Sequence, residues 1–291
     1  PQRNLEWVLN FLGYSERDLV ILVKNTSYMA IASAALAYRR SALMTATKVT
    51  VKPPSPEILK ARDDFKDFCT YMGKAPAKHM LEWHNELCTG EDSECLMGIG
   101  GPNTSILAPR GSAKSTVLGL FAAWMIGRHT MAKKMLRILY IAYMVDISRA
   151  KSATIKGILT SNKYREVFPM VRLSKIKRSD EYWSIDYEFA GIDTAGEEAF
   201  TIACGGLKGA ITSKRSQLVL IDDPIKSAAS INNPDIRREM EQTWSNVIAP
   251  TMFQGARAIC LGTRFHFDDI HATLFVPKNN WKQIVQKAVI T

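Results

Sequence analysis

The chain has 291 residues, 46% of them hydrophobic and 23% charged, so it can bury a large core and does not have the composition of a disordered protein. Its five cysteines are scattered without CxxC spacing, which argues against zinc and disulfide frameworks. The longest apolar region near the N-terminus, residues 28–38, is too short to span a bilayer. We therefore expect no membrane segment and a cytosolic setting.

The formal net charge of +10 is concentrated in one part of the chain. Residues 1–105 hold twelve Lys/Arg and twelve Asp/Glu, whereas residues 127–178 hold thirteen Lys/Arg and only two acidic residues. Neutralised phosphates release counterions, so such a segment predicts sequence-independent nucleic-acid binding; a solvated basic surface is the alternative. The candidate contacts are Lys151, Lys156, Lys175 and Lys177, with Lys208, Lys214 and Arg215 as a second set.

The N-terminal part has helical spacing up to about residue 50, then a proline-rich linker at 51–56 and a second helix predicted over 57–71. Residues 75–88 carry Trp83 and His84, which could contact an adenine or simply pack a helix onto the core. We assign residues 1–74 to a helical N-terminal region with its linker, and residues 75–291 to the main domain.

Residues 106–116, ILAPRGSAKST, predict a short strand, a tight loop and the start of a helix. Backbone N–H groups of such a loop, together with the helix dipole, favour a polyphosphate. Lys114 would reach the terminal phosphates and Ser115 the magnesium, so the expected ligand is ATP with Mg²⁺. Ala108 and Ala113 replace usual glycines, which leaves an ordinary strand-to-helix turn as the alternative. The predicted binding residues are Gly111, Ser112, Ala113, Lys114, Ser115 and Thr116.

From residue 106 onward, strands and helices alternate, which predicts an α/β fold with a mainly parallel sheet flanked by helices. The later strands are expected near 136–143, 218–221, 258–261 and 281–290. Helices are expected at 147–159 and from Asn233 to about 247, with Asn233 as the cap before a proline. A hairpin is expected between 182–189 and 199–203.

Two further motifs complete a nucleotide site. An apolar run ends in Asp222 and Asp223; the first acid would bind the magnesium shell, and the second would orient or deprotonate the attacking water. The alternative is an ordinary strand followed by a polar turn. Thr263 and Arg264 follow the next strand, at the sheet edge where ligands bind in α/β folds, and are candidates to sense the terminal phosphate.

In this order the motifs resemble those of the large terminase subunits of tailed bacteriophages. The matching pieces are WH at 83–84, LAPRGSAKST, YREVFP at 164–169, GGLKGAITSKRSQLVLIDDPI at 205–225 and LGTRFHFDDI at 261–270. The resemblance implies an ATPase of the helicase-like P-loop (ASCE) class that translocates double-stranded DNA into a procapsid in the host cytoplasm. It also implies the portal protein and the small terminase subunit as partners, and a homo-oligomeric ring, pentameric in the family.

The same resemblance assigns roles to several arginines. Arg110 would act within its own phosphate loop, and residues 262–264 would couple hydrolysis to movement. An arginine supplied to the neighbouring subunit is expected from Arg237, Arg238 or Arg264.

The chain departs from the family at two points. Asp223 stands where most relatives have glutamate, which leaves the catalytic base open. Family members also carry a C-terminal nuclease, and this chain ends near where it would begin, so we expect the ATPase portion without nuclease activity. The alternatives are a helicase or remodelling ATPase, and a DNA-binding assembly protein with a degenerate nucleotide site.

Overall fold

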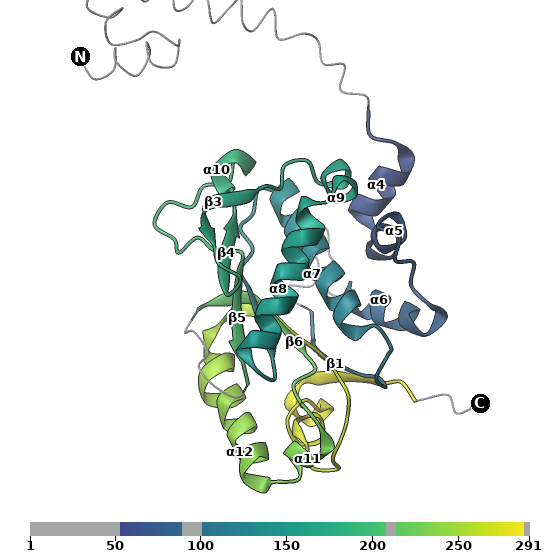
Figure 1. Ribbon diagram of the computed structural model, residues 1–291, viewed down its shortest axis with the longest axis vertical. Helices are drawn as coiled ribbons and strands as arrows, with labels where there is room; N and C mark the ends of the chain where they lie inside the picture. The colour runs from purple at the N-terminus through teal and green to yellow at the C-terminus, as the bar shows by residue number, and fades with distance from the viewer. Residues whose placement is uncertain (1–52, 89–100, 208–213, 288–291) are drawn as a thin grey trace, which may run out of the picture. The chain divides into compact units, whose positions relative to one another are not determined.

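An eight-stranded sheet runs through the computed structural model, which describes residues 53–88, 101–207 and 214–287. The strand order is β3-β4-β5-β2-β6-β7-β1-β8 (Figure 1). The strands are β1 Asn103–Leu107, β2 Ile138–Ala142, β3 Leu173–Arg178, β4 Tyr182–Ile185, β5 Ile202–Gly206, β6 Ser216–Asp222, β7 Met252–Gly262 and β8 Trp281–Val285. All neighbouring pairs from β5 to β8 are parallel, whereas β4 is antiparallel to both β3 and β5.

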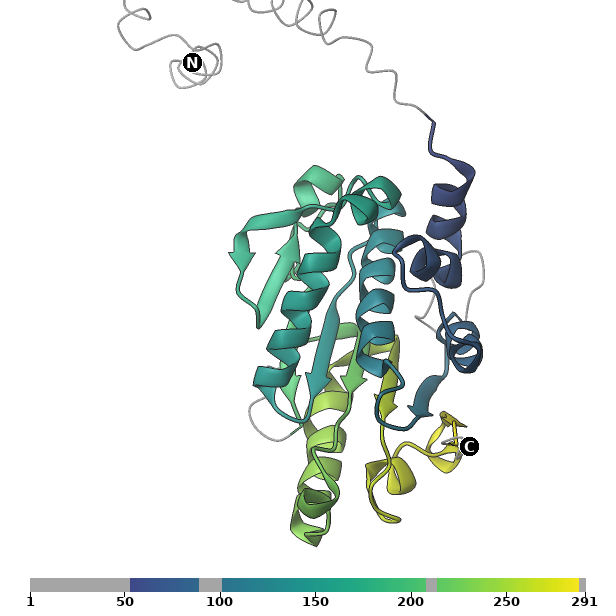
Figure 2. The same ribbon diagram turned by 45° about the vertical axis from the view of Figure 1, so that its right-hand side comes forward.

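Helices occupy most of the described connections between these strands (Figure 2). The longer α-helices are α4 Pro56–Asp63, α5 Phe65–Tyr71, α6 Leu81–Leu87, α7 Lys114–Met131, α8 Val145–Thr160, α9 Asn162–Val167 and α12 Pro234–Thr243. Single α-helical turns form α10 Tyr187–Ala190, α11 Ala228–Ile231 and α13 Ile270–Thr273, and a π-helical turn, η2 Trp244–Ile248, extends α12. Short 3₁₀ turns are η1 Lys78–Met80, η3 Ala249–Thr251 and η4 Pro277–Asn279.

Alternate residues of the central strands bury their side chains on opposite faces of the sheet. On one face, Leu218 and Leu220 of β6 belong to the cluster built with α7, α8 and α5. On the other face, Val219 and Ile221 pack with residues of α12 and the segment after β7. This two-sided burial confirms the predicted α/β fold with a mainly parallel sheet flanked by helices.

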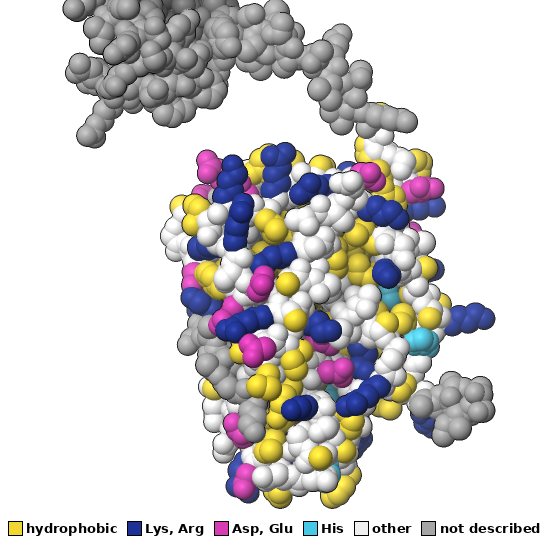
Figure 3. Space-filling model, viewed as in Figure 1, with side chains coloured by type: hydrophobic (Ala, Val, Ile, Leu, Met, Phe, Trp, Pro, Cys, Tyr) yellow, Lys and Arg dark blue, Asp and Glu magenta, His cyan; other side chains and the backbone are white. Residues whose placement is uncertain are grey.

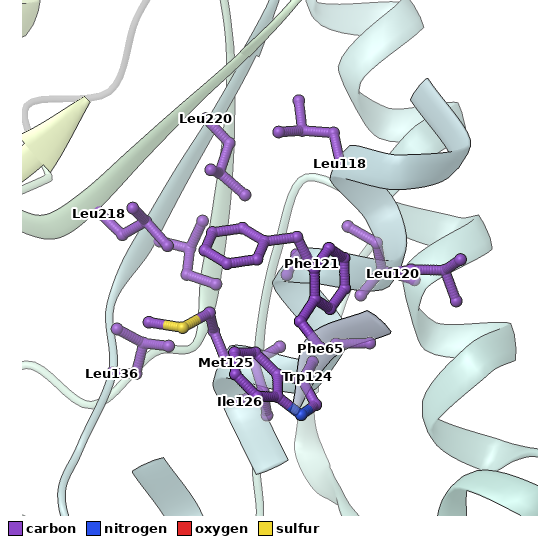
Figure 4. Close-up of a cluster of buried hydrophobic side chains, with 14 of the residues drawn as sticks. Phe65, Leu118, Leu120, Phe121, Trp124, Met125, Ile126, Leu136, Leu218 and Leu220 are labelled. Atoms are coloured by element: carbon purple, nitrogen blue, oxygen red, sulfur yellow. The ribbon is translucent and has the colours of Figure 1, made fainter. Parts of the chain in front are cut away.

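The α7 helix is buried along most of its length because it lies between the sheet and the N-terminal helices. Figure 4 shows Phe121 of α7 beside Leu218 and Leu220 of β6, and Phe65 of α5 beside Trp124. Phe65 is fully buried, and burying such a side chain contributes about 1.5–3 kcal/mol. Helices α4 and α5 therefore share one core with the sheet, although they belong to the segment 1–74 that we assigned to a separate N-terminal region.

The structure differs from two of the expected elements. The helix expected over 57–71 is two helices, because Asp64 takes an extended conformation and its side chain caps α5 by accepting from the Asp67 N–H. The hairpin exists as β4 with β5, but its first arm ends at Ile185, since Asp186 caps the short α10. The helices expected within residues 1–50, and Lys208, lie outside the described residues.

None of the helices in the described part of the chain is long and apolar enough to cross a membrane.

Candidate nucleotide-binding site

The loop between β1 and α7 turns through two residues with left-handed backbone angles. Gly111 has φ 82° and Ala113 has φ 57°, directly before Lys114 opens the helix. Left-handed residues in such a turn help to make a concave nest of backbone N–H groups for an anion. Ala108 has no positive φ, so replacing glycine there is free of strain, whereas Ala113 adopts its conformation at a cost of about 1–2 kcal/mol.

The Lys114 ammonium is held inside this loop. Its side chain is 4% exposed, and Nζ donates to the carbonyls of Ala108 at 3.2 Å and Pro109 at 2.9 Å, and to Thr263 Oγ1 at 2.9 Å. Asp223 Oδ1 lies 3.8 Å from the same nitrogen. Burial lowers the pKa of Lys114, and the two neighbouring carboxylates oppose that shift. The lysine therefore joins the phosphate loop to the ends of β6 and β7.

Asp222, at the end of β6, is buried with both oxygens hydrogen-bonded. Ser115 Oγ donates to Oδ1 at 2.8 Å, and the Tyr140 hydroxyl donates to Oδ2 at 3.0 Å. Burial raises the pKa of Asp222, while these two hydrogen bonds act in the opposite direction. A serine hydroxyl in contact with a carboxylate is the hard-oxygen donor set that Mg²⁺ takes beside ATP phosphates. Ser115 and Asp222 therefore fit the metal that the sequence motif implies.

Asp223 differs from Asp222 in conformation and exposure. Its φ is 43°, a left-handed angle that aspartate tolerates better than most residues, and its N–H donates to the Leu261 carbonyl at 2.9 Å. The side chain is 44% exposed, and Thr263 Oγ1 donates to Oδ1 at 3.4 Å. The sharp backbone turn thus sends two adjacent carboxylates in different directions, one into the protein and one toward solvent.

A cavity of about 480 Å³ lies at the carboxyl ends of the parallel strands. The loop residues 110–116, Asp223 and Thr263 line it. The other lining residues were not predicted as site residues; they are Tyr143, Ile147, Ile225, Lys226 and Phe265. The cavity is therefore built from four chain segments that are far apart in the sequence.

Gly262 permits the close approach of the strand β7 to the short helix behind it. A Cβ at this position would lie 2.6 Å from the His271 ring. Asp269 fixes the loop that follows, because its carboxylate accepts from the N–H groups of Phe265, His266 and His271. Thr263 is therefore held on a rigid support next to Lys114.

Trp83 and His84 lie in the core and do not line the nucleotide cavity. Trp83 is fully buried, and the His84 ring stacks on Phe65 with 4.7 Å between centroids. His84 Nδ1 lies 2.8 Å from the Met80 carbonyl oxygen. Of the two roles considered for this pair, the structure supports core packing and corrects the assignment to the adenine.

The two arginines of the motifs occupy different surroundings. Arg110 lines the cavity, donates to the Lys226 carbonyl at 3.1 Å and lies over the Phe265 ring at 5.0 Å. Arg264 turns to the following loop, where Nη2 donates to the Phe267 carbonyl at 3.1 Å. Thr263, not Arg264, is therefore the residue of this motif that the structure brings to Lys114.

The arginines of α12 also differ from each other. Arg237 donates to the carbonyls of Ile231 and Asn232 and lies 3.5 Å from Asp268 Oδ2, with 14% of its side chain exposed. Arg238 is 68% exposed, and among the described residues its guanidinium pairs with one carboxylate, that of Asp235 on the same helix, at 3.4 Å. Arg238 is thus free to reach another molecule without giving up a network of contacts.

Of the four candidate DNA lysines, Lys156 and Lys177 line one cavity. Lys151 lines a separate cavity behind Ser115 and Thr116. Lys156 donates to the carbonyls of Arg178 and Ser179 and to Asp180, and Lys177 donates to the Ala199 carbonyl. Lys175, on β3, is exposed.

Tyr140 contacts the site residue Asp222 but belongs to none of the sequence motifs. It lies on β2, three strand pairings away from β1 and the loop that follows it, and it reaches Asp222 because β2 pairs with β6. No local pattern marks it, although a tyrosine in an otherwise aliphatic buried strand implies a partner for its hydroxyl. Tyr140 therefore positions the carboxylate that we assign to the metal.

We expect Tyr140→Phe to raise the Mg²⁺ concentration needed for half-maximal ATP turnover by about tenfold, the usual scale for losing a hydrogen bond behind a metal ligand. Turnover at saturating Mg²⁺ should change little. Magnesium titrations of hydrolysis measure this directly. The matched control is Tyr164→Phe, which removes an equally buried hydroxyl that donates to the Ala123 carbonyl at 2.8 Å. An equal rise in the required Mg²⁺ concentration in both variants would mean that the Tyr140 hydroxyl has no specific effect on the metal.

No protein-family model matches this chain, and no curated protein does. Among solved structures, it is similar to a large terminase from a thermophilic bacteriophage bound to ATP-gamma-S, with 10% identity and a TM-score of 0.40 over 80% of this chain and 44% of that one. It is also similar to the ATPase domain of a Thermus phage large terminase, with 14% identity and a TM-score of 0.41 over 80% and 85% of the two chains.

A third similar structure is the complex of S. cerevisiae Dbp5 with ADP, with 9% identity and a TM-score of 0.42 over 81% and 53% of the two chains. The chain spans less than half the length of the first of these terminases. Because every one of these TM-scores is below 0.5, nothing about activity follows from the likenesses.

Proposed function

We propose that this chain hydrolyses ATP and uses the energy to move double-stranded DNA into a viral procapsid. One observation carries the ATPase part of the proposal. Lys114, Ser115, Asp223 and Thr263 line a single cavity at the carboxyl edge of a parallel sheet, and the buried Asp222 accepts a hydrogen bond from Ser115. Three separate motifs had to fold to one place for this to happen, and each has a role in phosphoryl transfer.

Each residue has a distinct part in the reaction. The loop N–H groups and Lys114 bind the phosphates and stabilise the charge that develops on them. Ser115 and Asp222 would hold Mg²⁺, which supplies charge neutralisation between the terminal phosphates. Asp223 orients a water molecule and accepts its proton as the oxygen attacks the terminal phosphorus and ADP leaves. Thr263 bonds both Lys114 and Asp223, so it is placed to register whether the phosphate is present.

The lining of the cavity also indicates where the adenine of ATP would lie. Phe265, Tyr143 and Ile225 supply apolar and aromatic surface next to the phosphate loop, whereas Trp83 and His84 are packed away in the core. An apolar wall with a few polar groups is the usual character of a nucleotide pocket. The adenine would therefore contact this apolar wall and not Trp83 and His84.

The motor part of the proposal rests on the order of the motifs and on the basic segment. It includes a ring of identical subunits docked on a portal, recruited with a small terminase subunit. Arg238 is our choice for an arginine that completes the site of a neighbouring subunit, because it is exposed and has few contacts of its own.

Steady-state ATP hydrolysis with and without linear duplex DNA tests the proposal, together with a strand-displacement assay. A packaging motor should hydrolyse ATP, respond to duplex and leave the strands paired. Strand displacement would instead favour a helicase. Duplex binding without measurable hydrolysis, at protein concentrations that permit assembly, would favour a DNA-binding assembly protein and contradict the proposal.

A further inference from the structure

A second cavity, of about 730 Å³, lies beside the C-terminal half of α8. Its walls come from α8, the segment around α9, and the antiparallel strands β3 and β4. The residues that matter here are Lys156, Arg165, Arg172, Lys177, Arg178 and Trp183. We call this the basic groove. Figure 3 shows Lys and Arg side chains gathered over the end of the molecule where α9 and β3 lie.

The charge of the basic groove is of one sign. Five of the described residues that line it are lysine or arginine, and none of the lining residues is acidic. Within the part of the chain that the structure describes, Lys156 is the one cation of the five that pairs with a carboxylate, that of Asp180 at 2.7 Å. Bringing like charges together is unfavourable unless a polyanion neutralises them. The groove is therefore built for an anionic ligand that carries several charges.

The cationic groups are held by contacts that leave their charge intact. Arg178 Nε donates to the Ser174 carbonyl at 2.8 Å, and Lys177 Nζ donates to the Ala199 carbonyl at 2.7 Å. The Arg172 guanidinium lies 3.6 Å from the centre of the Phe189 ring. Carbonyl and ring contacts orient a cation without neutralising it, so these groups are pre-arranged for phosphates.

The same groove offers no platform for unpaired bases. Trp183 is its one lining aromatic within the described residues, and it is fully buried beneath Lys156, whose Nζ lies 5.8 Å from the ring centre. Single-strand binding uses exposed aromatic faces on which bases stack. A duplex, by contrast, can be bound through its phosphates without any stacking on its bases.

We propose that the basic groove binds the phosphate backbone of double-stranded nucleic acid, a site that rests on the proposed motor function and gives it a location. The helix α8 joins this groove to the nucleotide cavity, since Ile147 in its first turn lines the cavity and Lys156 lines the groove. Nine residues of helix span about 14 Å. Duplex and nucleotide would thus contact the two ends of one rigid element.

Arg165→Gln combined with Arg178→Gln tests the groove at two exposed positions. Binding of a fluorescent 30-base-pair duplex is measured by anisotropy across a series of salt concentrations. We expect the magnitude of the slope of log affinity against log salt to fall by about two units, one for each lost phosphate contact. Affinity near 0.1 M salt should fall by about tenfold or more. Arg165→Lys with Arg178→Lys keeps both charges and should keep most of the slope.

The control is Lys60→Gln with Lys66→Gln, which removes the same charge from exposed positions on α4 and α5. An equal loss in this control would mean that net charge alone acts and would overturn the groove. An unchanged slope in the arginine variant would overturn it as well, and so would stronger binding of single strands than of duplex. If the wild-type protein hydrolyses ATP but binds no duplex at low salt, both the groove and the motor function are contradicted. If the wild-type protein binds duplex and the arginine variant binds it equally well, the groove is contradicted and the motor function stands.

Discussion

Lys114→Ala should reduce ATP turnover by about two to three powers of ten while leaving the protein folded. The substitution removes the ammonium that would stabilise charge on the transferred phosphate, an effect worth about 3–4 kcal/mol for one preorganised donor. In the structure this nitrogen contacts two backbone carbonyls of the loop and also the side chains of Thr263 and Asp223. No other ammonium among the described residues occupies that position. Hydrolysis rates and thermal unfolding on the same preparation measure both halves of the expectation.

Lys133→Ala is the matched control for this experiment. Lys133 lies just beyond the other end of α7, and its Nζ also donates to a backbone carbonyl, that of Ala190. Its removal should leave turnover unchanged. Undiminished hydrolysis in a folded Lys114→Ala protein would mean that the loop after β1 is not the phosphate site, whatever its conformation.

The parts of the site that the sequence predicted are those in which chemistry follows a local pattern. A strand, a small-residue turn and a helix beginning at Lys114 can be recognised within eleven residues, and so can an apolar run that ends in Asp222. Parallel strands bring their carboxyl ends to one edge, so both motifs were expected to meet there. The hydrogen bond from Ser115 to Asp222 shows that they do.

The parts that the sequence could not supply depend on pairing between distant strands. Tyr140 reaches Asp222 only because β2 lies next to β6, and Phe265 enters the cavity only because β7 lies between β6 and β1. Trp83 illustrates the opposite error. An aromatic residue upstream of a phosphate loop suits a base contact and a core contact equally, and only its burial in the structure decides between them.

The two alanines of the loop show how a departure from a motif acquires meaning in three dimensions. In the sequence, Ala108 and Ala113 weaken the match to the same extent. In the structure, only Ala113 occupies a left-handed position, so only this one works against its backbone. The loop nevertheless adopts the turn, because the helix behind it and the contacts of Lys114 fix both of its ends.

Asp223→Asn should lower turnover by about two to four powers of ten, while ATP affinity and the fold stay close to those of the unchanged protein. Asparagine has the shape of aspartate and is also tolerated at a positive φ, so the turn at 43° should survive. What disappears is the proton acceptor. Nucleotide affinity and single-turnover hydrolysis, measured separately, distinguish a chemical defect from a binding defect.

Asp222→Asn is the comparison that assigns the two acids. Its carboxylate is buried and bonded to Ser115 and Tyr140, so its loss should raise the Mg²⁺ requirement as well as slow hydrolysis. If Asp223→Asn hydrolysed ATP at a near-normal rate, the base would have to be another carboxylate. Asp269 is fully buried and committed to backbone N–H groups, which makes it unsuitable. Asp268 is half exposed and paired with Arg237 across the same loop, so Asp268→Asn would be the variant to measure next.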